Sequence, residues 1–206
     1  MIKAFRKPGL IACLAMLPAV STLAEENFSY SYFEFATGRV TLDDAVELDS
    51  REFSDLGALR LSAAHHFGEN FAVGGDWRIA TRERGPEEIT RVRSSLEAIF
   101  PVALTDRLDL VPRTGFTRVR LEDCVDDSCK RDTASGLHAG LGLRVWAVED
   151  SLEVFTNWRG NRMDEDESSL SLGAGFWWLD HHRLSLDVEG TDSQRAVLLG
   201  YRFSWQ

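Results

Sequence analysis

The last stretch of the chain, residues 196–206, alternates strictly between two kinds of side chain. Successive side chains of an extended strand point to opposite faces, so every second residue shares a face. One face is apolar and ends in aromatic rings, and it carries Val197, Leu199, Tyr201, Phe203 and Trp205. The other face is small or polar. This pattern predicts a strand between an apolar and a polar environment, either in the wall of a membrane barrel or in a soluble sheet over a core.

The first residues have the composition of a cleaved secretory signal peptide. A basic head with Lys3 and Arg6 precedes a short apolar run, and small residues, Thr22 and Ala24, stand at positions −3 and −1 of the expected cleavage site. The apolar run is too short to span a membrane comfortably. We therefore predict a signal peptide at residues 1–24 and one exported domain at residues 25–206.

Charge and cysteine content narrow the class of the exported domain. The net charge of −10 argues against a nucleic-acid partner. No segment after the signal peptide approaches the roughly 20 apolar residues of a transmembrane helix, so insertion into a membrane would have to use strands. Cys124 and Cys129 remain after processing, and an even number of cysteines in an oxidising compartment favours a disulfide.

Strand-like alternation continues through the whole exported domain. The ten segments that show it are residues 28–37, 56–67, 71–81, 90–100, 107–121, 137–148, 152–160, 169–179, 183–189 and 196–206. Every second connection is tight, and the others are longer, above all residues 38–55 and 122–133. An even number of strands with short turns at one end is typical of an outer-membrane barrel. The sequence predicts an all-β, antiparallel, up-and-down transmembrane barrel of about ten strands, with eight as the alternative.

The polar face of these strands is rich in arginine and contains no lysine. Arginine suits bidentate, partly buried pairing with carboxylates, whereas a solvated surface normally includes lysine. We therefore predict an ion-pair network in the lumen and apolar side chains towards lipid. Its expected members are Glu34, Arg60, Asp76, Arg78, Arg93, Glu97, Asp109, Arg113, Arg144, Glu153, Arg159, Asp187 and Arg202, with Arg183 and Glu189 on the same face. The alternative is a soluble periplasmic binding barrel with the faces reversed.

The exported domain resembles the small Gram-negative outer-membrane β-barrel families, of the OmpX, OmpA-domain and OmpW kind. The resemblance is carried by the opening Tyr30-Ser31-Tyr32-Phe33-Glu34, the alternating strands and the ending Gly200-Tyr201-Arg202-Phe203-Ser204-Trp205. It implies a place in the outer membrane, contact with lipid and lipopolysaccharide, and a monomer. It also implies that the barrel-assembly machinery reads the closing-strand aromatics Tyr201, Phe203 and Trp205, although the final residue is Gln206 rather than an aromatic.

Groups that could carry chemistry are sparse. His138 is the one histidine away from a tight turn, with Ser135 and Asp132 near it in sequence, but triads are defined by geometry rather than by sequence distance. The acidic run Asp164, Glu165, Asp166 and Glu167 is a weak candidate for Ca²⁺ or Mg²⁺, or for divalent ions shared with lipopolysaccharide phosphates. We expect no cofactor and no catalytic residue.

The resulting hypothesis is a non-enzymatic outer-membrane barrel with a plugged polar lumen and acidic surface loops. It would support envelope integrity or present its loops to a partner. The alternatives are a narrow channel for ions or small solutes, a hydrolase of lipid or peptide at the rim of the lumen, and the soluble periplasmic binding barrel.

Overall fold

The computed structural model describes residues 27–48, 51–68, 70–126, 128–163 and 167–205. The predicted signal peptide and Gln206 lie outside these residues. No helix among the described residues is long and apolar enough to cross a membrane. The strands are β1 (Tyr32–Leu48), β2 (Arg51–His66), β3 (Ala72–Arg84), β4 (Glu87–Ile99), β5 (Val102–Thr105), β6 (Leu108–Val125), β7 (Ser128–Val148), β8 (Leu152–Arg162), β9 (Glu167–Trp178), β10 (His182–Thr191) and β11 (Gln194–Ser204).

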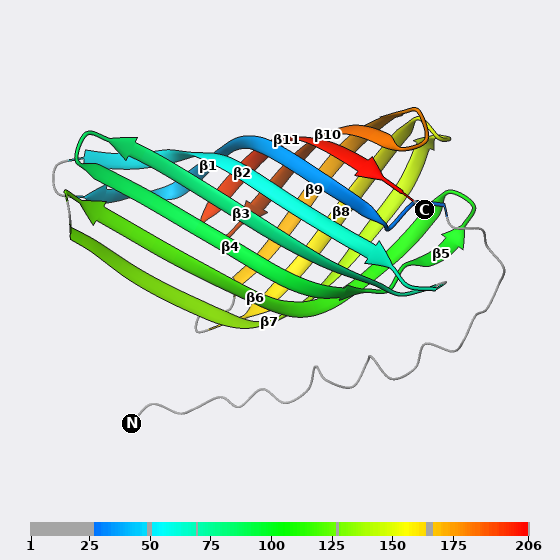
Figure 1. The fold of residues 1–206 in the computed structure, drawn as a ribbon, viewed down its shortest axis with the longest axis horizontal. Helices are drawn as coiled ribbons and strands as arrows, with labels where there is room; N and C mark the ends of the chain where they lie inside the picture. Colours follow the sequence, from blue (N-terminus) through cyan, green and yellow to red (C-terminus); the bar gives the residue numbers. More distant parts are fainter. Residues whose placement is uncertain (1–26, 49–50, 69, 127, 164–166, 206) are drawn as a thin grey trace, which may run out of the picture.

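The strands form one antiparallel barrel (Figure 1). Each strand pairs with its neighbour in sequence, and the closing strand β11 returns to pair with β1 from Tyr32↔Ser204 to Leu42↔Gln194. The short strand β5 pairs with β6 at the end that holds the C-terminus, and β4 continues the wall by pairing with β6 directly. Ten of the eleven strands therefore make the closed wall, which confirms the predicted fold class.

The outer surface of the wall is apolar, and the inner surface is polar. Leu141, Leu143 and Val145 of β7 are 45%, 39% and 36% exposed, whereas Arg144 between them is only 6% exposed. The same alternation holds on β9, β10 and β11, where the outward residues are large and hydrophobic. Hydrocarbon side chains thus face lipid, and charged groups face the lumen, as in outer-membrane barrels. This orientation is the opposite of the one that a soluble binding barrel requires.

The chain enters the barrel differently from the prediction. Residues 28–37 were expected to form the first strand, but β1 begins at Tyr32. The preceding residues turn into the lumen, where Phe28 and Tyr30 are 2% and 4% exposed. Their rings are buried against the inner surface near the C-terminal end of the molecule, together with Val111 and Trp146. Alternating aromatic residues signal an extended segment in either place, so periodicity alone did not separate the two.

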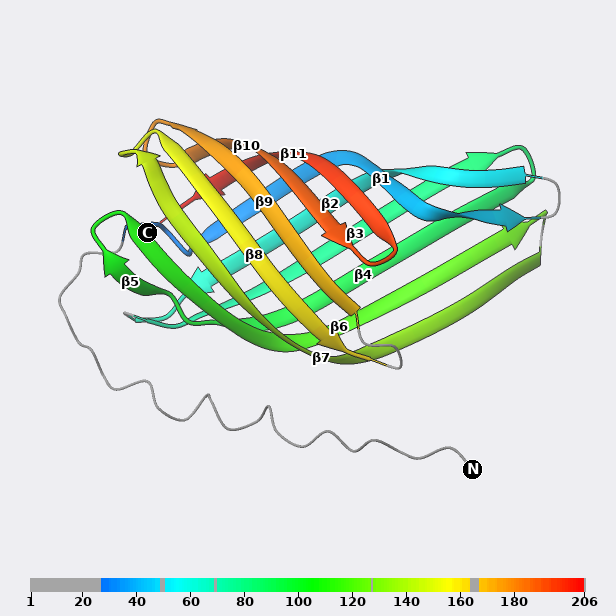
Figure 2. The ribbon, with the colours of Figure 1, turned by 180° about the vertical axis from the view of Figure 1, so that it is seen from behind.

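The long outer loops predicted at residues 38–55 and 122–133 are mostly strand. β1 continues to Leu48 and β2 begins at Arg51, while β6 and β7 stay paired as far as Val125↔Ser128. The strands β8 to β11 end much earlier, so the mouth of the barrel is bevelled, with a high wall of β1 to β4, β6 and β7 and a low rim of β8 to β11 (Figure 2). Above the membrane the wall has water outside, so its ladder can continue without an apolar outer face.

Pro112 lies within β6, although proline lacks the amide hydrogen that a strand normally donates. Its position explains why it is tolerated. The partner of β6 changes at this point, since pairing with β4 ends at Arg113 and pairing with β5 begins at Leu110. The carbonyl oxygen of Pro112 still accepts a hydrogen bond from the Phe100 amide at 2.9 Å. The missing donor therefore falls where the ladder is interrupted.

The lipid-facing orientation makes a testable prediction on β10. Leu186 is the middle of three outward residues on this strand and is 53% exposed. Because arginine is costly near the middle of the bilayer, we expect Leu186→Arg to lower the free energy of unfolding in liposomes by about 2–4 kcal/mol. Urea titration followed by gel mobility without boiling measures this loss.

The matched control is Thr133→Arg on the exposed outer part of β7, for which we expect a change of at most about 1 kcal/mol. Equal losses for the two variants would contradict the orientation.

Candidate functional site

The polar interior is organised in layers, and the first layer closes over the end that holds both Asn27 and the C-terminus. The Asn27 side chain donates to the carbonyl oxygen of Thr105 at 2.6 Å and to Asp109 at 2.8 Å. The Tyr30 hydroxyl donates to the other oxygen of Asp109 at 2.8 Å. Phe28 stacks on Trp146 with ring centroids 4.7 Å apart. The N-terminal segment is therefore fixed across the lumen by hydrogen bonds and ring packing.

The second layer is centred on Arg183, which is only 2% exposed. One amino group of its guanidinium donates to Glu153 at 2.9 Å and the other donates to Glu34 at 2.7 Å. Glu153 also accepts from Arg144 at 2.7 Å and from the indole of Trp177 at 3.0 Å. Buried charges require such direct compensation, because leaving one unpaired in a low-dielectric interior is expensive.

Glu34 joins this layer to the next one. Its carboxylate accepts from Arg60 at 2.6 Å and from Arg202 at 2.8 Å, in addition to Arg183. Arg60 also donates to Asp187 at 2.9 Å. One carboxylate thus holds guanidinium groups from β2, β10 and β11, which ties together strands on both sides of the β1–β11 seam.

A second group of charges lies around Glu97 on β4. Arg113 and Arg159 contact its carboxylate at 3.3 Å and 3.0 Å. His138 lies between Glu97, at 3.3 Å from Nε2, and the Thr117 hydroxyl, at 2.8 Å from Nδ1. A hydroxyl, an imidazole and a carboxylate in this order resemble a nucleophilic triad, but Thr117 and His138 are both buried. Ser135 and Asp132, which are near His138 in sequence, form no hydrogen bond with it among the described residues.

The outermost layer of the network centres on Glu189. Arg78 forms a two-pronged contact with its carboxylate at 2.6 Å and 3.0 Å, and Arg93 donates to it at 3.0 Å. Asp76 lies 3.8 Å from Arg93. This layer separates the interior below from a wider space above.

All thirteen expected network residues lie in the interior, and twelve of them take part in ion pairs with one another or with Arg183 and Glu189. Asp109 is the exception, since among the described residues it accepts hydrogen bonds from an amide and a hydroxyl. The space left among these side chains is a cavity of about 130 Å³. Glycine permits this crowding, because a Cβ atom at Gly175 would lie 2.6 Å from the Arg183 side chain.

Above the Glu189 layer, the bevelled mouth encloses a second and larger cavity of about 660 Å³, which we call the vestibule. Its lining from the high wall is mainly apolar, and its rim on the low side is polar apart from Met163. The apolar lining comprises Val40, Ala45, Val46, Ala80, Val92, Val119, Leu121 and Ala134, the acidic Asp44 lines the same wall, and the rim residues include Glu167, Asp192, Ser193 and Gln194. The sequence contained part of the pattern that predicts this apolar inner wall, because Val40 and Leu42 alternate with polar residues. These residues lay in a segment that we expected to be a loop.

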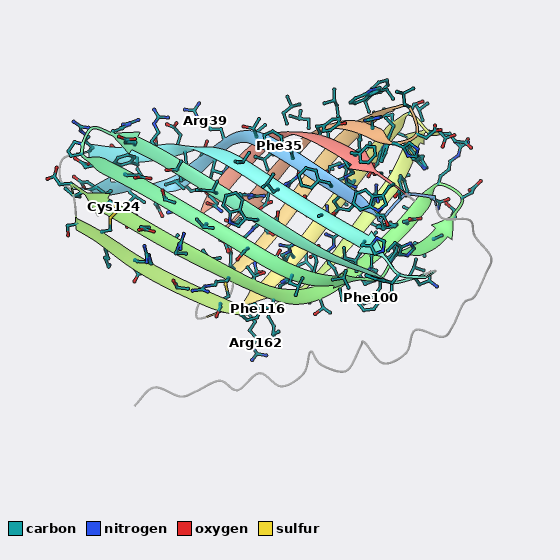
Figure 3. The ribbon with its side chains drawn as sticks, viewed as in Figure 1. Phe35, Arg39, Phe100, Phe116, Cys124 and Arg162 are labelled. Carbon is teal, nitrogen blue, oxygen red and sulfur yellow. A yellow bond between two sulfur atoms is a disulfide. The ribbon has the colours of Figure 1, made fainter. Side chains whose placement is uncertain are left out.

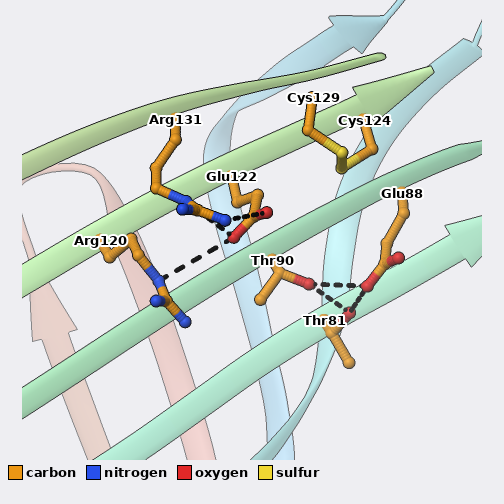
Figure 4. The surroundings of a disulfide bond; sticks show 8 residues. All are labelled: Thr81, Glu88, Thr90, Arg120, Glu122, Cys124, Cys129 and Arg131. Atoms are coloured by element: carbon orange, nitrogen blue, oxygen red, sulfur yellow. Dashed lines mark hydrogen bonds and ion pairs between the residues drawn. A yellow bond between two sulfur atoms is a disulfide. The ribbon is translucent and has the colours of Figure 1, made fainter. Parts of the chain in front are cut away.

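The predicted disulfide is present at the tip of the β6–β7 hairpin, where Cys124 and Cys129 are bonded (Figure 4). Below it, Glu122 accepts from Arg131 at 2.7 Å, and this hydrogen bond lowers the pKa of the carboxyl. Glu122 lies close to both sulfur atoms, but a disulfide has no thiolate to offer a metal. Of the acidic run, Asp164, Glu165 and Asp166 lie outside the described residues, so a cation site there stays a prediction.

The closing-strand aromatics Tyr201, Phe203 and Trp205 point outwards near the end of the barrel that holds Asn27 and the C-terminus. Other exposed rings, including Phe67, Phe71 and Phe100, lie at the same end and contact one another. Rings in this position suit the membrane interface. That the assembly machinery reads them stays a prediction.

The network predicts a large cost for removing one buried carboxylate. We expect Glu153→Gln to lower the free energy of unfolding by about 3–5 kcal/mol, because Arg144 and Arg183 lose their shared counter-charge. Denaturant unfolding in detergent micelles measures this change.

The control is Glu149→Gln in the exposed pair with Arg107, where we expect a loss of at most about 1 kcal/mol. A loss of that small size for Glu153→Gln would show that its arginines are solvated rather than dependent on the carboxylate.

Comparison with known proteins gives the fold a wider context. The sequence matches no protein-family model and no curated protein sequence. Among solved structures, the outer-membrane protease OmpT of Escherichia coli matches with a TM-score of 0.60 at 9% identity, over 90% of this chain and 99% of that one. The translocator domain of the autotransporter NalP of Neisseria meningitidis matches with a TM-score of 0.50 at 10% identity, over 88% of this chain and 91% of that one.

Sequence identities as low as these support a shared fold but not a shared activity. The likeness nevertheless agrees with the closed wall, the apolar exterior and the polar lumen described above. The chain therefore has the fold of the small Gram-negative outer-membrane β-barrel proteins, and its place is the outer membrane.

Proposed function

We propose that this protein is a non-conducting, non-enzymatic barrel that reinforces the outer membrane. The observation that carries the proposal is the filling of the lumen by successive layers of side chains. The N-terminal segment, the Arg183 layer and the Glu189 layer follow one another along the axis and leave a cavity of only about 130 Å³ among them. Moving an ion past these layers would require breaking buried ion pairs, which is costly.

A mechanical role suits this interior better than transport does. The charged contacts join strands far apart in sequence, such as β1 with β10 through Glu34 and Arg183, and β3 with β10 through Arg78 and Glu189. Such links brace the barrel across its diameter. The burial of Thr117 and His138 supports the absence of catalysis, since a substrate would have no access to either group.

Lipopolysaccharide is the partner that the outer surface suits best. Arg118 follows the lipid-facing Phe116 as the next outward residue of β6, and Arg162 is in register with the lipid-facing Leu137. Both arginines are exposed and form no ion pair with a described residue. Figure 3 shows Phe116 and Arg162 projecting from the same side of the barrel. Arginine binds phosphate with its planar fork, so these residues suit the phosphates just above the acyl chains.

Conductance tests the closed lumen. We expect the folded protein to give no steady current steps in planar bilayers, because the layered ion pairs leave no continuous water path. Gel mobility before and after boiling must first show that the inserted protein is folded. Steady, reproducible steps from that material would overturn the non-conducting barrel and favour the channel alternative.

Lipopolysaccharide binding tests the proposed role in the envelope. We expect lipopolysaccharide to raise the unfolding temperature of the parent protein, and Arg118→Gln with Arg162→Gln to lose most of that rise. The comparison is Arg107→Gln at the opposite end of the barrel, which should keep the full rise. An undiminished rise in the double variant would refute the role of the two arginines.

A further inference from the structure

The vestibule is a separate space from the closed lumen, and its chemistry is mixed. Its volume of about 660 Å³ lies within the range of small-molecule sites. Apolar side chains such as Val119 and Leu121 cover the inner face of the high wall, whose outer face carries the exposed Arg118 and Arg120 at this level. An apolar concavity that faces water is unfavourable when it is empty, since apolar surface gains free energy on leaving water.

The base of the vestibule is positively charged. Arg78, Arg91 and Arg93 line it, and Arg78 and Arg93 pair with the carboxylates of Glu189 and Asp76. Asp44, Glu167 and Asp192 also line the vestibule, but none of them forms an ion pair with Arg91. Arg91 forms no ion pair with a described residue.

The Arg91 guanidinium donates one long hydrogen bond of 3.4 Å to the amide oxygen of Gln194. The nearest acidic groups that act on it, Asp123 and Glu167, do not come within ion-pair distance. A half-buried guanidinium of this kind has unused donors for an anionic group, and charge-assisted hydrogen bonds are the strong ones.

The vestibule opens towards the lipid surface. Its low rim is formed by Met163 and Glu167 beside β8 and β9, and by Asp192 to Gln194 between β10 and β11. The lipid-facing side chains continue almost to the ends of these strands, with Leu170 on β9 and Val197 on β11 both exposed. The rim is therefore close to the upper edge of the apolar belt, whereas the opposite wall rises well above it (Figure 2).

We propose that the vestibule binds a single-chain anionic amphiphile, a long aliphatic carboxylate, that crosses the low rim from the outer leaflet. Its carboxylate pairs with Arg91 at the base, and its chain packs against Val119, Leu121 and Ala80 on the high wall. The site is separate from the closed lumen below it. It gives the bevelled mouth a ligand-binding role. It requires no opening of the ion-pair layers.

Native mass spectrometry of the full-length protein in a neutral detergent tests the site with hexadecanoate as the probe. We expect a saturable one-to-one complex, and an increase of about tenfold or more in the dissociation constant for Arg91→Gln, because one charge-assisted contact is lost. Val119→Trp, which fills the cavity, should abolish the complex. The matched control is Arg131→Gln on the outer surface of the β6–β7 hairpin, which should bind like the parent protein.

Other probes separate the possible sources of the anion. Hexadecanol should bind more weakly than hexadecanoate and should not distinguish Arg91→Gln from the parent, while inorganic phosphate should not compete. Equal binding of hexadecanoate by the parent and Arg91→Gln would overturn the proposal. Competition by phosphate would overturn it by showing that the chain contributes nothing, and tighter binding of phosphatidylglycerol would overturn it in favour of a two-chain lipid. Gel mobility without boiling confirms that every variant is folded, and conductance is read separately, so the two proposals fail independently.

Discussion

The structure depends on the mutual neutralisation of buried guanidinium and carboxylate groups. Arginine cannot lose its charge in a protein, so every arginine that faces the lumen must find an acceptor there. Glu34 meets this need for three arginines at once, and Arg183 bridges Glu34 to Glu153. The contacts fix the side chains of opposite walls relative to one another. The wall itself supplies hydrogen bonds only between neighbours, so these charges supply the connections across the barrel.

The bevelled mouth follows from a difference in strand length. β6 and β7 pair continuously for far longer than β9 and β10, and the β1–β2 ladder shifts its register between Thr41 and Val46. This bulge bends the outer hairpin over the mouth, where Leu42 and Phe53 are buried together. The outer part therefore has a small hydrophobic core of its own. Stability above the membrane comes from apolar packing, whereas stability within it comes from ion pairs.

The sequence predicted much of this arrangement because a barrel wall separates two environments. Where lipid lies on one side and charged groups on the other, as around Arg144, strict alternation identifies both faces. The same rule did not identify the strands in residues 38–55. Water replaces lipid outside this part of the wall, so its outward residues are polar and the sequence resembles that of a loop. It also could not show that Phe28 and Tyr30 turn inwards, because an aromatic residue suits the lumen as well as the wall. Which arginine pairs with which carboxylate depends on three-dimensional register, which only the structure supplies.

The position of the N-terminal segment bears on the stability of the closed barrel. Ser29 and Ser31 form hydrogen bonds with Trp205, directly beside the seam between the first and last strands of the wall. The completed wall encloses Phe28 and Tyr30, and these hydrogen bonds tie the segment that carries them to the closed seam. The leading segment and the seam therefore stabilise each other, so a change that frees residues 27–31 would also remove two of the contacts that hold the end of the closing strand.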